Sequence, residues 1–110
     1  MGDRISIQFT DGNEYSVVFN HHCAGLRLIQ EVREYISLLN AQKPEGTFDP
    51  IDRREPSAIM PHFIGWYMCQ KDCGTGSIRL GCNESDNDNS DNGHFIFNLK
   101  TGLWNREASE

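Results

Sequence analysis

The residues best suited to chemistry stand together at His21-His22-Cys23. The triplet falls where a predicted strand gives way to a predicted helix, and the N–H groups and dipole of a helix start favour a thiolate there. A neighbouring imidazole can act as the base for such a nucleophile. One hypothesis is therefore a small thiol- or metal-dependent enzyme that uses Cys23 with His21 or His22 and with His94. The competing interpretation is a polar junction with a partly buried cysteine, which the absence of any complete catalytic motif favours.

A second arrangement concerns zinc. Cys69 and Cys73 are four positions apart on a predicted helix and so share a face, while Cys82 and His94 could approach from strands. A structural zinc site needs four such ligands in a tetrahedron, and this spacing matches no zinc knuckle. Because cysteine is among the most commonly buried residues, we expect reduced, metal-free core thiols.

A third candidate site is the acidic loop, which we define as residues 83–93. Its Asp86, Asp88 and Asp91 are candidate calcium ligands, since hard cations take carboxylate oxygens at alternate positions. The EF-hand pattern fails, however, because counting from Asp88 puts Leu99 where the bidentate Glu belongs. The sequence favours a solvated loop without a metal.

The charges of the acidic loop also predict a partner. Glu84, Asp86, Asp88 and Asp91 fall within eight positions with no basic residue among them, so their repulsion predicts an extended, mobile loop. Such a charged surface speeds encounter with a basic protein. The leading hypothesis is an interaction domain without catalytic activity, in which the acidic loop and the connection 41–56 contact a partner protein.

Composition bounds the remaining choices. The chain has 110 residues, 37% of them hydrophobic, and a formal net charge of −6, which fits one globular domain and disfavours a phosphate backbone as partner. Neither an apolar leader nor a membrane-spanning run is present, so we expect a cytoplasmic protein with no membrane role. Gly74-Thr75-Gly76 lacks the Lys-Ser/Thr of a phosphate-binding loop, and no cofactor is expected.

Periodicity predicts the elements that must position these residues. Apolar residues alternate before and after Asp11-Gly12, which predicts a hairpin, and from Ala24 to Asn40 they step by three and four, which predicts an amphipathic helix. The connection 41–56 has no period. A second helix is expected from Pro56 or Ser57 to Lys71, unless Pro61 delays its start.

The stretch Ser77 to Leu99 reads as two paired strands around the acidic loop, with Asn92-Gly93 as the turn. The expected fold class is α+β, an antiparallel sheet of about four strands in ββααββ order with two helices on one face. Residues 1–104 form the domain, with a possible short strand at Leu103-Trp104, and residues 105–110 form a frayed polar tail.

The alternation also predicts the core. One face of the first hairpin should meet the apolar stripe of the first helix and the last strand. The expected members are Ile5, Ile7, Phe9, Tyr15, Val17, Phe19, Ile29, Val32, Ile36, Phe95 and Phe97. The aromatic residues between Phe63 and Trp104 read as core rather than as a ligand platform.

Overall fold

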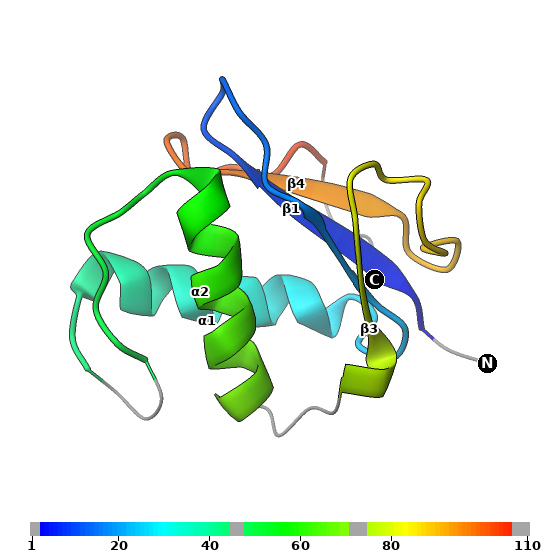
Figure 1. The fold of residues 1–110 in the computed structure, drawn as a ribbon, viewed down its shortest axis with the longest axis horizontal. Helices are drawn as coiled ribbons and strands as arrows, with labels where there is room; N and C mark the ends of the chain where they lie inside the picture. Colours follow the sequence, from blue (N-terminus) through cyan, green and yellow to red (C-terminus); the bar gives the residue numbers. More distant parts are fainter. Residues whose placement is uncertain (1–2, 45–47, 71–74, 107–110) are drawn as a thin grey trace.

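The computed structural model describes residues 3–44, 48–70 and 75–106, which form a four-stranded sheet and two α-helices. The elements in chain order are β1 (Ile5–Thr10), β2 (Val18–His21), α1 (Arg27–Ala41), α2 (Pro56–Gln70), the short 3-10 helix η1 (Thr75–Ser77), β3 (Ile78–Gly81) and β4 (His94–Asn98). The predicted α+β class and the ββααββ order are confirmed (Figure 1).

The sheet is mixed, so the predicted purely antiparallel sheet is wrong. Its strands lie in the order β3-β2-β1-β4, and β1 pairs antiparallel with β2 but parallel with β4. Five residue pairs join β1 to β4, from Ser6 with His94 to Thr10 with Asn98. The strand nearest the N-terminus is therefore central in the sheet, and it is held there by the last strand of the chain.

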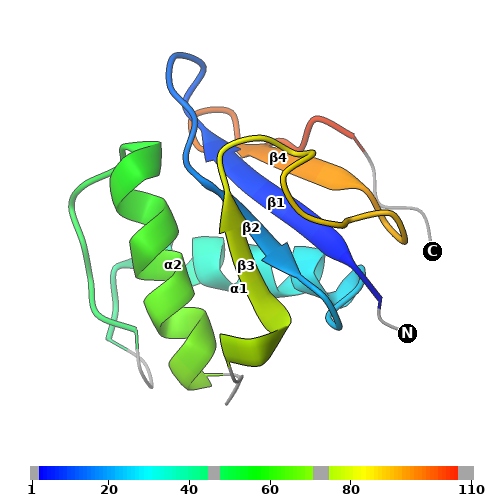
Figure 2. The same ribbon diagram turned by 45° about the vertical axis from the view of Figure 1, so that its right-hand side comes forward.

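The prediction that β3 and β4 pair around the acidic loop is also wrong. The two strands run in the same direction at opposite edges of the sheet, and two other strands lie between them. A tight turn cannot join parallel strands, because such a connection must travel back along the sheet. The acidic loop does so by passing over the sheet face that the helices leave free (Figure 2).

The first hairpin is confirmed, but its second strand changes register. Near the turn Thr10 is opposite Tyr15, whereas further along Ile7 is opposite Phe19, so β2 carries one extra residue. Such a β-bulge reverses which face the side chains before it occupy. Tyr15 and Val17, predicted to be core residues, are therefore 59% and 46% exposed, while Phe19 is fully buried.

Both helices pack on the face of the sheet formed by Ile5, Ile7 and Phe9. Helix α1 ends at Ala41, because Gln42 adopts a left-handed conformation and donates its backbone N–H to Leu38 O. Helix α2 runs without a break through Pro61, so the alternative start at Pro61 is wrong. The carbonyl that Pro61 cannot bond belongs to Ser57, which is exposed to solvent.

The core is largely the predicted one and is rich in aromatic rings. Phe63 of α2 lies at its centre, within 6.0 Å, between ring centroids, of five other aromatic rings. These rings belong to Phe9, Phe19, Tyr35, Trp66 and Tyr67. Ile36, predicted to be core, is only half-buried.

Two side chains fix the described part of the connection 41–56. Phe48 is buried against Tyr35 and His62. The side-chain amide of Gln42 bonds both backbone groups of Ile51, with Nε2 to O at 2.9 Å and N to Oε1 at 3.0 Å. This connection is thus held to the domain at two points. Neither helix in the described ranges is long and apolar enough to span a bilayer.

Candidate functional site

The structure separates the members of the proposed thiol site. His21 faces the helices, with its ring 5.8 Å from that of Tyr67, whereas His94 lies on the opposite face of the sheet. The Nδ1 atom of His21 accepts hydrogen bonds from the backbone N–H groups of Cys23 and Ala24, each at 3.0 Å. This nitrogen therefore orders the start of the following turn and is not directed at the thiol.

The thiol itself is exposed. Cys23 Sγ lies 3.9 Å from the hydroxyl of Ser77. The preceding residue, His22, is half-buried. The described contacts bring neither His22 nor His94 to the sulfur. The residues named for the enzyme hypothesis thus occupy separate places in the fold.

His94 belongs to a buried polar network under the acidic loop. Its Nδ1 is 2.7 Å from Ser6 Oγ and its Nε2 is 3.1 Å from Gln8 Oε1. The side-chain nitrogen of Gln8 donates to Ser16 O, so the side-chain oxygen of Gln8 faces His94. This amide oxygen can only accept, so Nε2 of His94 carries the proton and donates to Gln8, and Nδ1 of His94 accepts from the Ser6 hydroxyl. Asn89 of the loop donates to Ser6 Oγ at 2.8 Å.

The geometry of this network resembles that of a catalytic serine–histidine pair, but the serine hydroxyl is not accessible to a substrate. Ser6 is 0% exposed, so no substrate reaches its hydroxyl, and Asn89 already occupies one lone pair of the oxygen. A neutral glutamine follows the imidazole, where a carboxylate would be needed to stabilise an imidazolium. The network fixes the loop to the sheet.

Burial of His94 and His21 predicts a loss of stability in mild acid. Burial lowers the pKa of both imidazoles below the usual value, with Arg27 and His22 adding to the effect at His21 and Glu84 opposing it at His94. The unfolded chain therefore binds protons first, and the free energy of unfolding should fall as the pH decreases from about 7 through the lowered pKa values. Urea unfolding at a series of pH values measures this slope.

The matched variant for this prediction is His94→Gln. The quantity compared is the change in the free energy of unfolding with pH, and not the free energy itself. The variant's free energy of unfolding should change less between pH 7.5 and 5.5 than that of the unaltered protein, because one of the two groups is gone. Carboxylates titrate mainly below this window. An unchanged slope, or a stability that rises as the pH falls, would contradict the assignment.

The carboxylates of the acidic loop are engaged within the molecule. Arg4 forms ion pairs with Asp88 and, through Nε at 2.9 Å, with Asp91. Asp86 Oδ2 accepts the backbone N–H groups of Cys82 and Asn83. The prediction of a loop with no opposing base is therefore wrong, because the base comes from the far end of the sequence.

These contacts also lower the pKa values of the three aspartates. For Asp91 the main cause is the hydrogen bond from the Arg4 side chain, and for Asp86 and Asp88 it is bonding from backbone N–H groups. Glu84, the fourth predicted partner-binding residue, is exposed. Three of the four acids thus stabilise the path of the loop over the sheet.

The cysteines do not form the predicted core cluster. Cys23, Cys69 and Cys82 are free and exposed, and Cys73 lies outside the described residues. Within residues 3–44, 48–70 and 75–106 no three His, Cys, Asp or Glu side chains gather closely enough to hold a metal ion. The core-thiol interpretation is wrong for Cys69 and Cys82, because aromatic rings fill the core instead. Cys23, predicted to be partly buried, is exposed as well.

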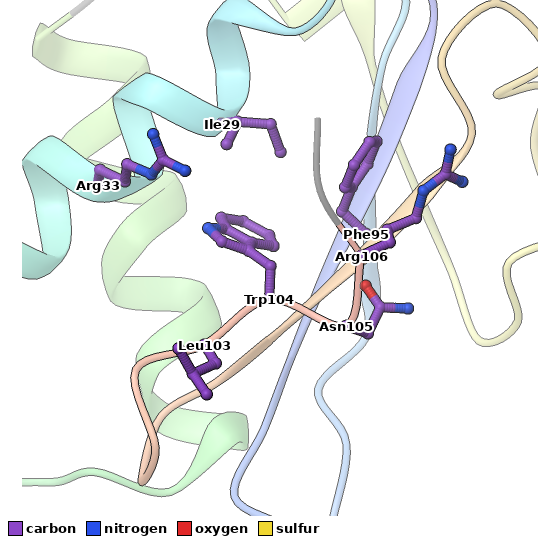
Figure 3. A pocket seen from close by; sticks show the side chains of 7 residues that line it. All are labelled: Ile29, Arg33, Phe95, Leu103, Trp104, Asn105 and Arg106. Carbon is purple, nitrogen blue, oxygen red and sulfur yellow. The ribbon is translucent and has the colours of Figure 1, made fainter. Parts of the chain in front are cut away.

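A groove of about 520 Å³ lies between α1 and the segment that follows β4 (Figure 3). We call it the basic groove. Its walls come from one face of α1, from β4 and from the chain after Gly102. The lining residues are Ile29, Arg33, Phe95, Leu103, Trp104, Asn105 and Arg106. A smaller hollow that shares Arg33, Leu103 and Trp104 with it continues the groove along α1.

The segment beyond β4 is held as an additional short strand. Asn98 N donates to Leu103 O and Asn105 N donates to Ile96 O, each at 2.9 Å, and Phe97 forms an antiparallel bridge with Trp104. The predicted strand character of Leu103-Trp104 is thus confirmed as a bridge. Pairing reaches Asn105, which had been assigned to the tail; residues 107–110 of that tail lie outside the described part.

Basic side chains stand on both sides of the Trp104 ring. Figure 3 shows Arg33 projecting from α1 near the indole nitrogen, and Arg106 on the other side, over Phe95. The Arg106 guanidinium carbon lies 4.6 Å from the centroid of the Phe95 ring. In the described part of the chain neither arginine forms an ion pair, and no acidic side chain lines the groove.

The remaining polar groups of the groove are hydrogen-bond donors. Asn105 Oδ1 accepts the N–H of Ile96 at 2.8 Å, which leaves its amide nitrogen available. Trp104 Nε1 is buried and finds no acceptor among the described residues. Since guanidinium and indole groups cannot accept hydrogen bonds, the chemical complement of this surface is an acceptor that carries negative charge.

Sequence reasoning missed the basic groove. The pattern places Arg33 on the polar side of the predicted amphipathic helix, Trp104 in the core and Arg106 in the tail. Their convergence depends on the chain turning back along β4 after Gly102, which has a φ of 73°. A signal was present in the Lys100-Thr101-Gly102 turn followed by Leu103-Trp104, which predicts a return strand.

Comparison of the chain with models of protein families, with curated proteins and with solved structures finds no match in any of the three. The basic groove and the buried network are accordingly interpreted from their own chemistry.

Proposed function

We propose that this protein is a non-catalytic interaction domain whose basic groove binds an acidic segment of a partner protein. The segment combines carboxylates, which pair with Arg33 and Arg106, with apolar side chains that pack on Leu103 and Trp104. The interaction-domain hypothesis drawn from the sequence is thereby retained, but the contact surface and the charge of the partner change.

One observation carries the proposal: the groove is lined by two arginines that form no ion pair with a described residue, and no described acidic residue lines it. The chain as a whole has sixteen acidic and ten basic residues, so the charge of this groove is opposite to the net charge. Leu103, at 67% exposed, adds a large apolar side chain beside these charges. Apolar anchors next to complementary charges are typical of recognition surfaces.

A peptide fits this groove better than a single-stranded nucleic acid does. Nucleic-acid grooves need aromatic faces on which bases can stack. Here Phe95 is 1% exposed and its ring already carries Arg106, and the Trp104 ring packs edge-on against Phe97, with centroids 5.1 Å apart. The overall charge of −6 would also repel a polyphosphate.

The test uses fluorescein-labelled peptides of equal length that alternate leucine with glutamate or with lysine, and a labelled oligothymidylate. Fluorescence anisotropy should show saturable binding of the glutamate peptide alone, weakening as salt increases. The variant Arg33→Glu/Arg106→Glu should raise the Kd about tenfold or more, because like charges then face each other.

The control is Arg79→Glu, which makes one Arg→Glu change on β3 at the opposite edge of the sheet and is compared with each of the single variants Arg33→Glu and Arg106→Glu. It should leave the Kd for the glutamate peptide within about twofold, since exposed charges separated by more than a Debye length of about 8 Å are largely screened. Equal effects of the control and of the single groove variants, or preferential binding of the lysine peptide or the oligothymidylate, would overturn the proposal.

Two expectations from the sequence stay predictions: a cytoplasmic location, and a basic partner for the acidic loop. The lysine peptide tests the second directly. Binding of that peptide that is abolished by Glu84→Gln would place a basic partner on the exposed acid of the loop.

A further inference from the structure

The backbone of the segment beside the basic groove has N–H and C=O groups that no described residue bonds. In an antiparallel pair, successive residues direct their N–H and C=O groups to opposite sides of the strand. Leu103 O and Asn105 N both bond to β4, so the N–H and C=O of Trp104 point away from the sheet. No described residue bonds either group. Trp104 thus presents at the sheet edge one donor and one acceptor that no described residue bonds.

This edge also overhangs the basic groove. The Trp104 side chain lies on the same side of the sheet as α1, packed against Phe95 and Phe97. A strand placed beside Trp104 would direct every second side chain to that side, toward Arg33 and the indole N–H, and the intervening ones away from it. The spacing of such side chains, about 7 Å, brings two of them over one groove.

We infer that the acidic segment binds by strand addition: it extends the sheet along Leu103–Asn105 through the backbone groups of Trp104 and places carboxylates, at alternate positions, beside Arg33 and Trp104 Nε1. This inference rests on the proposed function and specifies its geometry. Recognition of an extended segment at a sheet edge, with pockets for alternate side chains, is an established mode of peptide binding.

Two features support this geometry, and the first of them favours an extended over a helical occupant. The edge offers backbone groups, which a helical ligand cannot use because its own N–H and C=O groups are bonded internally. The indole N–H of Trp104 is a buried donor without an acceptor in the described part of the chain, and such a group is destabilising unless it is bonded. A carboxylate beside it would supply that acceptor.

The experiment is an N-methyl scan of the glutamate–leucine peptide, which removes one backbone donor at a time and leaves its charge unchanged. Strand addition predicts one sensitive position: methylation should weaken binding about tenfold or more at the residue whose N–H bonds to Trp104 O, and much less at its neighbours. Hydrogen exchange at the Trp104 backbone amide should slow when the unmodified peptide is present.

The outcomes separate the two proposals. Binding that depends on Arg33 and Arg106, yet shows no position sensitive to N-methylation and no change in exchange at Trp104, overturns strand addition and leaves the proposed function intact. Absence of charge-dependent peptide binding removes both. Slow exchange at Trp104 in the free protein, together with a concentration-dependent dimer in sedimentation, would mean that a second copy of the chain covers the edge, which also overturns the inference.

Discussion

Phe63→Ala should lower the free energy of unfolding by about 3–5 kcal/mol, the usual cost of emptying a large aromatic site in a well-packed core. Phe63 is fully buried, and its five ring contacts connect α2 to β1, β2 and α1. The melting temperature should fall by about 10–30 °C. Urea unfolding followed by far-UV circular dichroism measures the change.

Two variants control for this result. Phe63→Leu retains much of the volume and should cost clearly less than Phe63→Ala. Leu103→Ala removes an exposed apolar side chain and should change stability by no more than about 0.5 kcal/mol. A loss below about 1 kcal/mol for Phe63→Ala would show that α2 does not pack on the sheet in this way.

Asn20→Leu should instead stabilise the protein, by about 1–3 kcal/mol. Asn20 lies in the middle of β2, opposite Ser6 and Arg79, and is 0% exposed. Neither its Nδ2 nor its Oδ1 has a hydrogen-bond partner within the described residues. Leucine has the same branched skeleton without the polar atoms, so the desolvation penalty of the amide is removed while the packing is kept.

Gln8→Met is the matched comparison, because Gln8 is a second buried amide on the same face of the sheet. Its amide is bonded at both ends, to Ser16 O and to His94, so its removal should destabilise the protein. The two substitutions are therefore expected to have opposite signs. Equal losses for both would mean that Asn20 has a partner after all, and would refute the prediction.

The sequence predicted the fold as far as local periods reach. The hairpin, both helices and most of the core residues follow from alternation by two or by three and four. The exposure of Tyr15 and Val17 does not, because a single extra residue in β2 reverses the faces without altering the alternation in the sequence. A bulge is a property of pairing with β1, and so is invisible in β2 alone.

The pairing partners of the strands could not be predicted from the sequence for a different reason. Phe95 and Phe97 alternate in the same way whether β4 pairs with β3 or with β1. The choice is made by how much apolar area each arrangement buries, and pairing with β1 places both rings in the core, at 1% and 5% exposed. Arg4 then approaches Asp88 and Asp91 as a consequence of that pairing. The basic groove could not be predicted for the same reason.

The parallel pairing of β1 with β4 has a consequence for how the chain reaches this structure. Ser6 and His94 are 88 positions apart, so β1 gains its second neighbour only after β4 has been synthesised. Closing so long a loop is entropically costly and slows folding. During translation the hairpin of β1 and β2 would expose a bare, apolar edge to chaperones and to other nascent chains. During translation this domain should therefore complete its fold only after β4 has left the ribosome.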